Sequence, residues 1–307
     1  MTGDGSYMGF VGVTTGSSSI RRIFPAWARE LGLPTDTLIG HDVAPDAPPH
    51  VYRTLTEQIR ADPKHRGCLI TTHKMAMFTA ASELFDDLDD LAAEFGEISS
   101  MYKRDGKLFG AARDPLTVRA AAAGFIPADH FATTGAEVLC MGSGGSGLAL
   151  THQLGTRADR PARITCTARS EPPLQHLRAV HTEAGFDPAL YRYVVTPSPR
   201  DADALLAELA PASLVVNATG LGKDRPGSPL TDTAVFPERA LVWEFNYRGS
   251  LEFLHQAEAQ QRARELTIED GWRYFVHGWS QVIADVFDIS MPPTTVANLA
   301  RVAASIR

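Results

Sequence analysis

The sequence has little cysteine, no excess of basic residues and no long apolar run. Its three cysteines, Cys68, Cys140 and Cys166, are too few and too scattered for a disulfide framework or a structural zinc site. We expect them to behave as small buried apolar residues in a reducing cytoplasm. No metal site is predicted.

Charge and hydropathy exclude two further classes of partner. The chain carries 29 Lys and Arg against 36 Asp and Glu, a formal net charge of −7, which argues against a broad surface for nucleic acid or anionic membrane. No apolar run reaches the roughly 18 residues of a membrane-spanning helix, and residues 1–13 lack a basic region before an apolar core. We therefore expect a cytoplasmic protein without membrane or nucleic-acid partners. Its 307 residues suffice for one large or two ordinary domains.

The most informative stretch is a glycine-rich turn between an apolar run and a helical pattern. Residues 138–141 are typical of a short strand, and residues 148–154 carry apolar side chains at helical spacing. Between them lie Gly142, Ser143, Gly144, Gly145, Ser146 and Gly147, which fit the G-x-G-x-x-G spacing only loosely. Glycine lets the backbone turn sharply and lets a pyrophosphate approach the free N–H groups of a helix N-terminus. Such a run also occurs merely as a connection, so its context must decide.

Two later strand ends supply that context. Residues 162–167 form a second β-rich run, followed by Ala168, Arg169 and Ser170. An acid at this point of a dinucleotide fold suits NAD, whereas an arginine suits the 2′-phosphate of NADP; a solvated loop arginine is the alternative. A third apolar run, residues 214–217, leads through Asn217 into Ala218, Thr219 and Gly220. Because ligands of parallel sheets bind beyond the carboxyl ends of strands, these turns predict a dinucleotide-binding domain that prefers NADP to NAD.

The N-terminal part also alternates strands and helices. We expect strands at residues 10–13, 38–43 and 67–70 and helices at residues 20–33 and 51–60. Ser17, Ser18 and Ser19 precede the first helix and can either hold an anion or cap the helix. The third strand leads into Thr72, His73 and Lys74, where a lysine is ordinarily solvent-facing. The acidic residues 80–95 are expected to form one helix with a solvated face.

The middle and the end of the chain complete an α/β pattern. Residues 99–103 and 107–109 predict a hairpin around Asp105-Gly106, and Asp114 before Pro115 is typical of a helix N-cap for residues 116–123. A strand at 240–245, a helix at 251–262, a strand at 266–268 and helices at 274–287 and 295–306 follow. The predicted fold is α/β with two domains: residues 1–115, completed by returning C-terminal helices in 272–307, and a Rossmann-type doubly wound domain in 116–271.

The order of these signals resembles the shikimate dehydrogenase family over nearly the whole chain. The family's Ser-x-Ser falls within residues 17–19, its Asn-Val-Thr-x-Pro-x-Lys corresponds to residues 68–74, and its Gly-x-Asn-Thr-Asp to residues 110–114. Its Gly-x-Gly-Gly matches residues 142–145, its Asn-Arg-Thr corresponds to residues 168–170, and its Asn-Ala-Thr matches residues 217–219 outright. Its Asp-x-x-Tyr corresponds to residues 244–247, and its Asp-Gly to residues 270–271.

The resemblance implies Lys74 and Asp114 as the catalytic pair. Hydride exchange at a secondary alcohol requires a proton to leave or join the oxygen; a lysine can carry it, and a carboxylate can orient the lysine. The final proton acceptor stays open. The implied cofactor-binding residues are those of the three turns named above. The implied substrate-binding positions are Ser17, Ser19, Cys68, Thr72, Ser99, Tyr247 and Gly278.

The substrate positions depart from the family pattern. Two family asparagines are replaced by Cys68 and Ser99, and the glutamine of the returning helix by Gly278. Each amide would offer both a donor and an acceptor, and losing several bonds of about 1 kcal/mol each weakens shikimate binding by orders of magnitude. We therefore expect a substrate other than shikimate. Tyr247 and the serines still suit an anionic head group. His73, His277 and Trp279 either line a bulkier pocket or belong to the core or the surface.

Three functions remain to be compared. The first is an NADP-dependent oxidoreductase, monomeric or homodimeric, that acts on a hydroxylated cyclic acid or its ketone in aromatic amino acid or secondary metabolism. The second is a catalytically silent NADP-binding regulatory or sensor protein, against which the retention of Lys74 and Asp114 speaks. The third, a methylenetetrahydrofolate dehydrogenase type, also uses a lysine but fits the surroundings of Asp114 and Asn217 less well.

Overall fold

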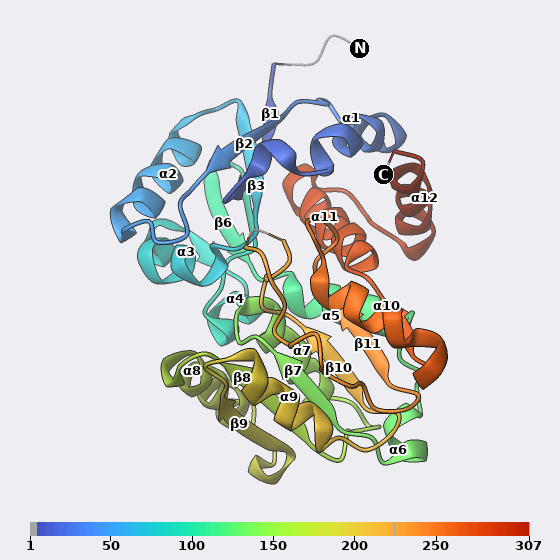
Figure 1. The fold of residues 1–307 in the computed structure, drawn as a ribbon. Coiled ribbons are helices and arrows are strands. Elements are labelled where there is room, and N and C mark those ends of the chain that lie inside the picture. The colour runs from blue at the N-terminus through green and yellow to red at the C-terminus, as the bar shows by residue number, and fades with distance from the viewer. Residues whose placement is uncertain (1–4, 224, 307) are drawn as a thin grey trace. The chain divides into compact units, whose positions relative to one another are not determined.

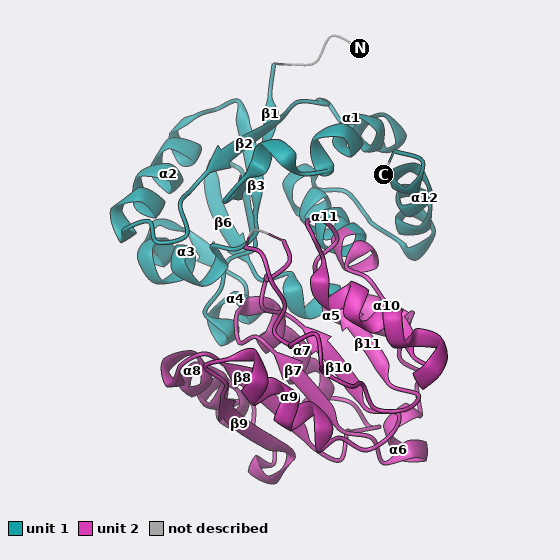
Figure 2. Cartoon of the chain, in the orientation of Figure 1, with its two compact units in different colours: residues 1–117, 276–307 teal, residues 118–275 magenta. Residues whose placement is uncertain are grey.

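The computed structural model describes residues 5–223 and 225–306, so residues 1–4 and 307 of the first expected domain and residue 224 of the second lie outside it. The chain divides into two compact units, residues 1–117 with 276–307 and residues 118–275 (Figure 2). Both units are α/β, which confirms the predicted fold class (Figure 1). No helix in the described part of the chain is long and apolar enough to cross a membrane.

The first unit contains a six-stranded sheet in the order β2-β1-β3-β5-β6-β4. Its strands are β1 (Tyr7–Gly12), β2 (Leu38–Asp42), β3 (His65–Ile70), β4 (Asp87–Leu88), β5 (Ser100–Arg104) and β6 (Lys107–Ala111). Its helices are α1 (Ile20–Leu31), α2 (Pro49–Ala61), α3 (Lys74–Ala81), α4 (Asp90–Phe95) and α12 (Pro293–Ala304), with the start of α5 (Asp114–Ala123) and the later part of α11 (Trp272–Phe287).

Helices cover both faces of this sheet. Side chains alternate along β1, so that Val11 packs in one core cluster with Tyr52 of α2, while Phe10 meets Trp279 of α11 with ring centroids 5.0 Å apart. Beside α11, the Trp27 indole of α1 donates to the Leu299 carbonyl of α12 at 2.9 Å. The returning C-terminal helices thus complete the core of the first unit.

Strand direction determines which loops meet at one edge of the sheet. β1, β2 and β3 are parallel, and β5 is antiparallel to both β3 and β6. The carboxyl ends of β3 and β6 therefore lie at the same edge as the amino end of β5. Three chain segments, residues 71–74, 97–99 and 112–114, meet there although they are distant in sequence.

The single acidic helix expected at residues 80–95 is wrong. The chain forms the end of α3, a 3₁₀ turn at Ser82–Leu84, strand β4 and the short helix α4 instead. Long-range pairing interrupts the helical pattern, because Leu88 pairs with Gly110 on β6 and the Asp86 carboxylate accepts a hydrogen bond from the Leu108 backbone at 2.8 Å. Asp89 then caps α4 by accepting from the Ala92 N–H at 2.8 Å, so these acids are structural rather than merely solvated.

The second unit contains a parallel six-stranded sheet in the order β12-β11-β10-β7-β8-β9. Its strands are β7 (Val138–Met141), β8 (Ile164–Ala168), β9 (Tyr191–Val195), β10 (Leu214–Asn217), β11 (Leu241–Glu244) and β12 (Thr267–Glu269). Its helices are α6 (His130–Thr134), α7 (Gly145–Gly155), α8 (Glu171–Glu183), α9 (Pro199–Ala207) and α10 (Glu252–Arg264), with the remaining parts of α5 and α11.

This strand order is the doubly wound one, and the winding reverses between β7 and β10. Side chains of α9 and α10, including Leu205 and Phe253, pack with Leu139 and Val215 in one core cluster. Residues 214–217, expected as the third strand of this unit, form the fourth, because β9 lies between them and β8 in the chain and was not predicted. Tyr191 of β9 stacks on the His181 ring of the preceding helix α8, and Tyr193 lies tilted beside the same ring.

Candidate active site

Lys74 and Asp114 form an ion pair at the edge where three segments of the first unit meet. Lys74 is the first residue of α3, shortly after β3, and Asp114 is the first residue of α5, shortly after β6. Their side chains are only 13% and 8% exposed. Two residues 40 positions apart are thus held in a largely desolvated contact.

The helix ends treat the two charges differently. A helix N-terminus favours an anion and disfavours a cation, so α5 stabilises the Asp114 carboxylate, whereas α3 does not favour the Lys74 ammonium. Asp114 is therefore the counter-ion that balances the charge of Lys74 at this helix end. Removing one partner of such a buried pair leaves an uncompensated charge.

A third ionisable side chain, Glu97, lies beside this pair. It is fully buried, and neither carboxyl oxygen has a hydrogen-bond partner among the described residues. The backbone holds it there, because the Ile98 N–H donates to the Lys74 carbonyl at 3.1 Å. Burial, reinforced by the charge of Asp114, raises the pKa of Glu97 to about 8, although Lys74 opposes the rise. Glu97 therefore carries its proton at neutral pH.

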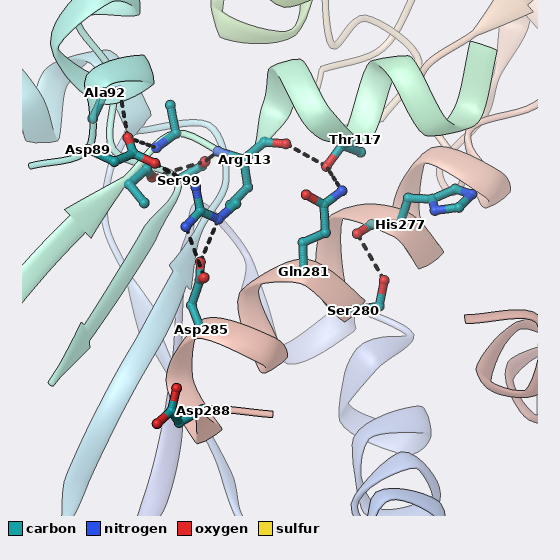
Figure 3. A network of polar contacts seen from close by, with 12 residues as sticks. Asp89, Ala92, Ser99, Arg113, Thr117, His277, Ser280, Gln281, Asp285 and Asp288 are labelled. Carbon is teal, nitrogen blue, oxygen red and sulfur yellow. Dashed lines mark hydrogen bonds and ion pairs between the residues drawn. The ribbon is translucent and has the colours of Figure 1, made fainter. Parts of the chain in front are cut away.

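The turn before Asp114 is fixed by Arg113 (Figure 3). The Arg113 guanidinium donates to both carboxylate oxygens of Asp285 on α11, at 2.7 and 2.9 Å, and to Asp89 at 2.5 Å. Burial disfavours this cation, but the two carboxylates outweigh it and raise the pKa of Arg113. The Ser99 hydroxyl accepts from the Arg113 backbone N–H at 2.7 Å, so this predicted substrate residue supports the same turn.

The other two altered substrate positions offer no amide. Cys68 lies in the core on β3 with no exposed surface, and burial raises the pKa of its thiol to about 12. Gly278 lies on α11, where an added Cβ would be in ordinary contact with Thr117 at 3.7 Å. One turn later, Gln281 donates its amide to the Thr117 hydroxyl at 3.3 Å (Figure 3). An amide is therefore present on α11 near the start of α5, displaced from the position that sequence reasoning considered.

Ser19 and Ser17 differ from the expected helix caps. Ser19 is the N-cap residue of α1 but makes no capping hydrogen bond with its side chain, and the exposed Ser17 donates to the Thr14 carbonyl at 3.3 Å. Thr72 is exposed in the turn before α3. Since β1 and β3 are parallel, Ser17, Ser19 and Thr72 follow strands that end at the same edge of the sheet.

Of the three aromatic candidates for a bulkier pocket, two belong to the core. His73 is buried, with Nε2 3.0 Å from the Val43 carbonyl and Nδ1 3.0 Å from the Tyr52 hydroxyl. A carbonyl only accepts, so Nε2 carries the proton and Nδ1 accepts from Tyr52. Trp279 is buried as well. His277 is half-buried, and its carbonyl accepts from Ser280 (Figure 3).

In the second unit, the glycine-rich turn combines close packing with open space. Gly142 has φ +112°, and a Cβ there would lie 2.5 Å from the backbone of Ala218; a Cβ on Gly147 would lie 2.2 Å from the Gly142 carbonyl. Gly144, the N-cap of α7, has ordinary φ, and a Cβ there would meet no described atom within 4 Å. Gly142 and Gly147 are thus needed for packing, whereas Gly144 leaves the helix N-terminus accessible, as a pyrophosphate requires.

The predicted cofactor-binding residues lie at the carboxyl ends of three adjacent strands. They are Gly142, Ser143, Gly144, Gly145 and Ser146 after β7, Ala168, Arg169 and Ser170 at β8, and Asn217, Ala218, Thr219 and Gly220 at β10. This is the point at which the strand order reverses, the usual ligand position of open parallel sheets. Arg169 is exposed, and Ser143 is buried.

Two side chains that are not among the predicted site residues organise this region. Glu244 is buried and accepts from the side chains of Asn217 and Asn246, each at 2.7 Å; burial raises its pKa to about 8 despite these bonds. Tyr274 donates to the Ser146 hydroxyl at 3.0 Å. Tyr247, the predicted substrate residue of this unit, packs against Phe275 and Trp272. Glu244 lies within the strand predicted at residues 240–245 and in the segment that corresponds to the family's Asp-x-x-Tyr, and this was the available signal.

Comparisons with known proteins find similarity to shikimate dehydrogenases in sequence and in fold. No family model matches the sequence. An NADP(+) shikimate dehydrogenase of Sphingopyxis alaskensis is 28% identical over 270 residues, which cover 87% of this chain and 85% of that protein.

Solved structures share the fold at lower identity. Shikimate dehydrogenase 1 of Peptoclostridium difficile has a TM-score of 0.74 at 14% identity, covering 96% of this chain and 97% of that one. Quinate dehydrogenase of Corynebacterium glutamicum, in complex with NAD, has a TM-score of 0.73 at 18% identity, covering 98% and 99%. A 5-ketofructose reductase of a Gluconobacter strain has a TM-score of 0.67 at 17% identity, covering 98% of each chain. The chain is thus similar in sequence to a shikimate dehydrogenase over most of its length, and it shares the two-unit fold of these solved structures.

Proposed function

We propose that the chain is an NADP-dependent dehydrogenase or ketoreductase that interconverts a secondary alcohol and a ketone on a hydroxylated cyclic acid other than shikimate. The observation that carries this proposal is the desolvated ion pair of Lys74 and Asp114 at the starts of α3 and α5. The reducing cytoplasm is its proposed location, in keeping with three free buried cysteines.

The chemistry assigned to the pair is proton transfer at the reacting oxygen. The Lys74 amine accepts the proton of the substrate hydroxyl during oxidation, and its ammonium returns a proton to the carbonyl oxygen during reduction. Asp114 holds the lysine in position and balances its positive charge. The limited exposure of both side chains keeps water from competing for the same proton.

The proposed cofactor site lies at the switch point of the second unit. The open N-terminus of α7 at Gly144 would hold the pyrophosphate, and Arg169 would hold the 2′-phosphate of NADP. A nicotinamide dinucleotide, when bound, supplies or accepts the hydride. The Sphingopyxis relative is an NADP(+) enzyme, whereas the quinate dehydrogenase structure is a complex with NAD, so the cofactor preference that we propose depends on Arg169.

The proposal of a substrate other than shikimate depends on three positions in the first unit. Cys68 is enclosed in the core, Ser99 is committed to the backbone of Arg113, and Gly278 carries no side chain. None of them offers the amide that the family uses to bind ring hydroxyls. We assign to the substrate instead the amide of Gln281, which donates to Thr117 near the start of α5.

Absorbance of NADPH in the presence of candidate substrates tests this proposal. The purified protein would be assayed with NADP(H) and NAD(H) against shikimate, quinate, their amino and deoxy analogues, and cyclic ketones. We expect turnover of an analogue with NADP(H), lost in Lys74→Met and retained in Lys64→Met, which removes an exposed lysine from the same unit. Efficient turnover of shikimate would refute the substrate argument. Cofactor binding without any turnover would favour the regulatory or sensor function.

A further inference from the structure

The Lys74–Asp114 pair has a third neighbour whose chemistry the proposed reaction does not yet use. Glu97 precedes β5, the one strand that runs antiparallel between β3 and β6, so the topology brings it to the edge where Lys74 and Asp114 meet. The ladder continues beyond β5, because the Ser99 carbonyl accepts from the Ile70 N–H at 2.9 Å.

Burial without partners makes the charge of Glu97 costly. A carboxylate enclosed in protein without hydrogen-bond donors is strongly destabilised, so the neutral acid is the favoured form. The other charged groups that act on it are Asp114 on α5, Lys74 on α3 and Asp89 before α4. Asp89 is paired with Arg113, and Asp114 with Lys74. Glu97 is thus the member of this group whose charge no partner neutralises.

We propose that Glu97 is a positioning residue that controls, through its own ionisation, whether Lys74 is held as an ammonium or can act as a neutral amine. This inference builds on the proposed dehydrogenase function.

The proton balance shows in which direction the ionisation of Glu97 should change alcohol oxidation and ketone reduction. In alcohol oxidation the substrate O–H bond breaks and an N–H bond forms on Lys74, so the lysine must start as the amine. In ketone reduction the reverse transfer requires the ammonium. While Glu97 is neutral, only Asp114 holds the ammonium. Once Glu97 has lost its proton, a second negative charge favours the ammonium, which supports reduction and opposes oxidation at alkaline pH.

The test compares pH profiles of wild type, Glu97→Gln and Asp90→Asn. The glutamine side chain keeps the size of the glutamate but cannot ionise, and Asp90→Asn removes an exposed carboxylate of α4 as a matched control. In Glu97→Gln we expect the rising limb of alcohol oxidation and the falling limb of ketone reduction both to move to lower pH, by about one unit, the scale of coupling between neighbouring groups. In Asp90→Asn both limbs should stay in place. Rates scaled equally at every pH in Glu97→Gln would mean a merely structural role and overturn the proposal.

A second measurement needs neither substrate nor cofactor. Protein labelled with ¹³C at the glutamate side-chain carboxyls is titrated by NMR, and the resonance absent from Glu97→Gln is assigned to Glu97. We expect this resonance to titrate near pH 8. With ¹⁵N-labelled lysine, the Lys74 resonance, assigned by its absence in Lys74→Met, should lose its proton at lower pH in Glu97→Gln than in wild type. If the Lys74 resonance titrates at the same pH in both proteins, the proposal about Glu97 is wrong even if dehydrogenase activity is found. If it titrates at lower pH in Glu97→Gln while no substrate turns over, only the proposed dehydrogenase function fails.

Discussion

Replacing Glu97 with glutamine should remove much of the alkaline instability of the first unit. The pKa of Glu97 is raised from 4.5 to about 8, a difference of roughly 3.5 units. At about 1.36 kcal/mol per unit, this corresponds to roughly 5 kcal/mol as an upper figure, since relaxation and water entry reduce the cost of a buried charge. The sign follows from proton binding. Below about pH 4.5 both folded and unfolded chains hold the proton, and the stabilisation is complete. Between about pH 4.5 and 8 only the folded chain holds it, so the free energy of unfolding falls as pH rises.

Urea unfolding at pH 5, 7 and 9 measures this effect. Wild type should lose stability relative to Glu97→Gln across that range, whereas Asp90→Asn should follow wild type. Glu244 has the same raised pKa, but it is present in all three proteins and cancels in the difference. Parallel stability curves for wild type and Glu97→Gln would refute the reasoning, because they would mean that Glu97 ionises as easily in the folded as in the unfolded chain.

Further predictions concern both units. Gly144→Ala should leave thermal stability unchanged and weaken NADPH binding, measured by fluorescence titration. Gly142→Ala should destabilise the protein itself, because its Cβ would overlap the backbone of Ala218. Equal losses of thermal stability in the two variants would contradict the proposal that the N-terminus of α7 is open at Gly144. Arg169→Ser should raise the KM for NADP about tenfold and leave that for NAD nearly unchanged, as expected for one lost charge-assisted hydrogen bond; an equal effect on both cofactors would argue against a phosphate contact. Arg113→Met should cost about 3–5 kcal/mol in urea unfolding, because it leaves the carboxylates of two partly buried aspartates without their cation; a loss below about 1 kcal/mol, the value of an exposed pair, would contradict this.

The order of elements could largely be predicted because local patterns determine it. The apolar run at β7 ends at a glycine turn, and the structure has the strand at Val138–Met141 as expected. The hairpin around Asp105 and Gly106 is confirmed for the same reason: both residues have positive φ, 50° and 77°, as the tight turn requires.

Long-range contacts account for what could not be predicted. The pairing of Leu88 with Gly110 converts an apparently continuous acidic helix into strand and helix, and nothing within residues 80–95 indicates this. His73 stands beside a candidate catalytic lysine in sequence, but its ring is fixed in the core by Tyr52 and Val43. Glu97 comes near Lys74 only because β5 runs antiparallel between two parallel strands. Such residues require the topology before their chemistry can be interpreted.

The central claim, that Lys74 and Asp114 carry the proton transfer, is tested most directly by single-turnover kinetics of Lys74→Met and Asp114→Asn with NADP(H) and the best substrate of the panel. The account predicts a rate of the chemical step lowered by roughly 10²–10⁴-fold in Lys74→Met, the range of general acid–base catalysis, with NADPH affinity unchanged. Asp114→Asn should be impaired as well, and Lys64→Met should not. Turnover within about tenfold of wild type in Lys74→Met, below that range, would contradict the account, because the proton would then have to be carried by another group.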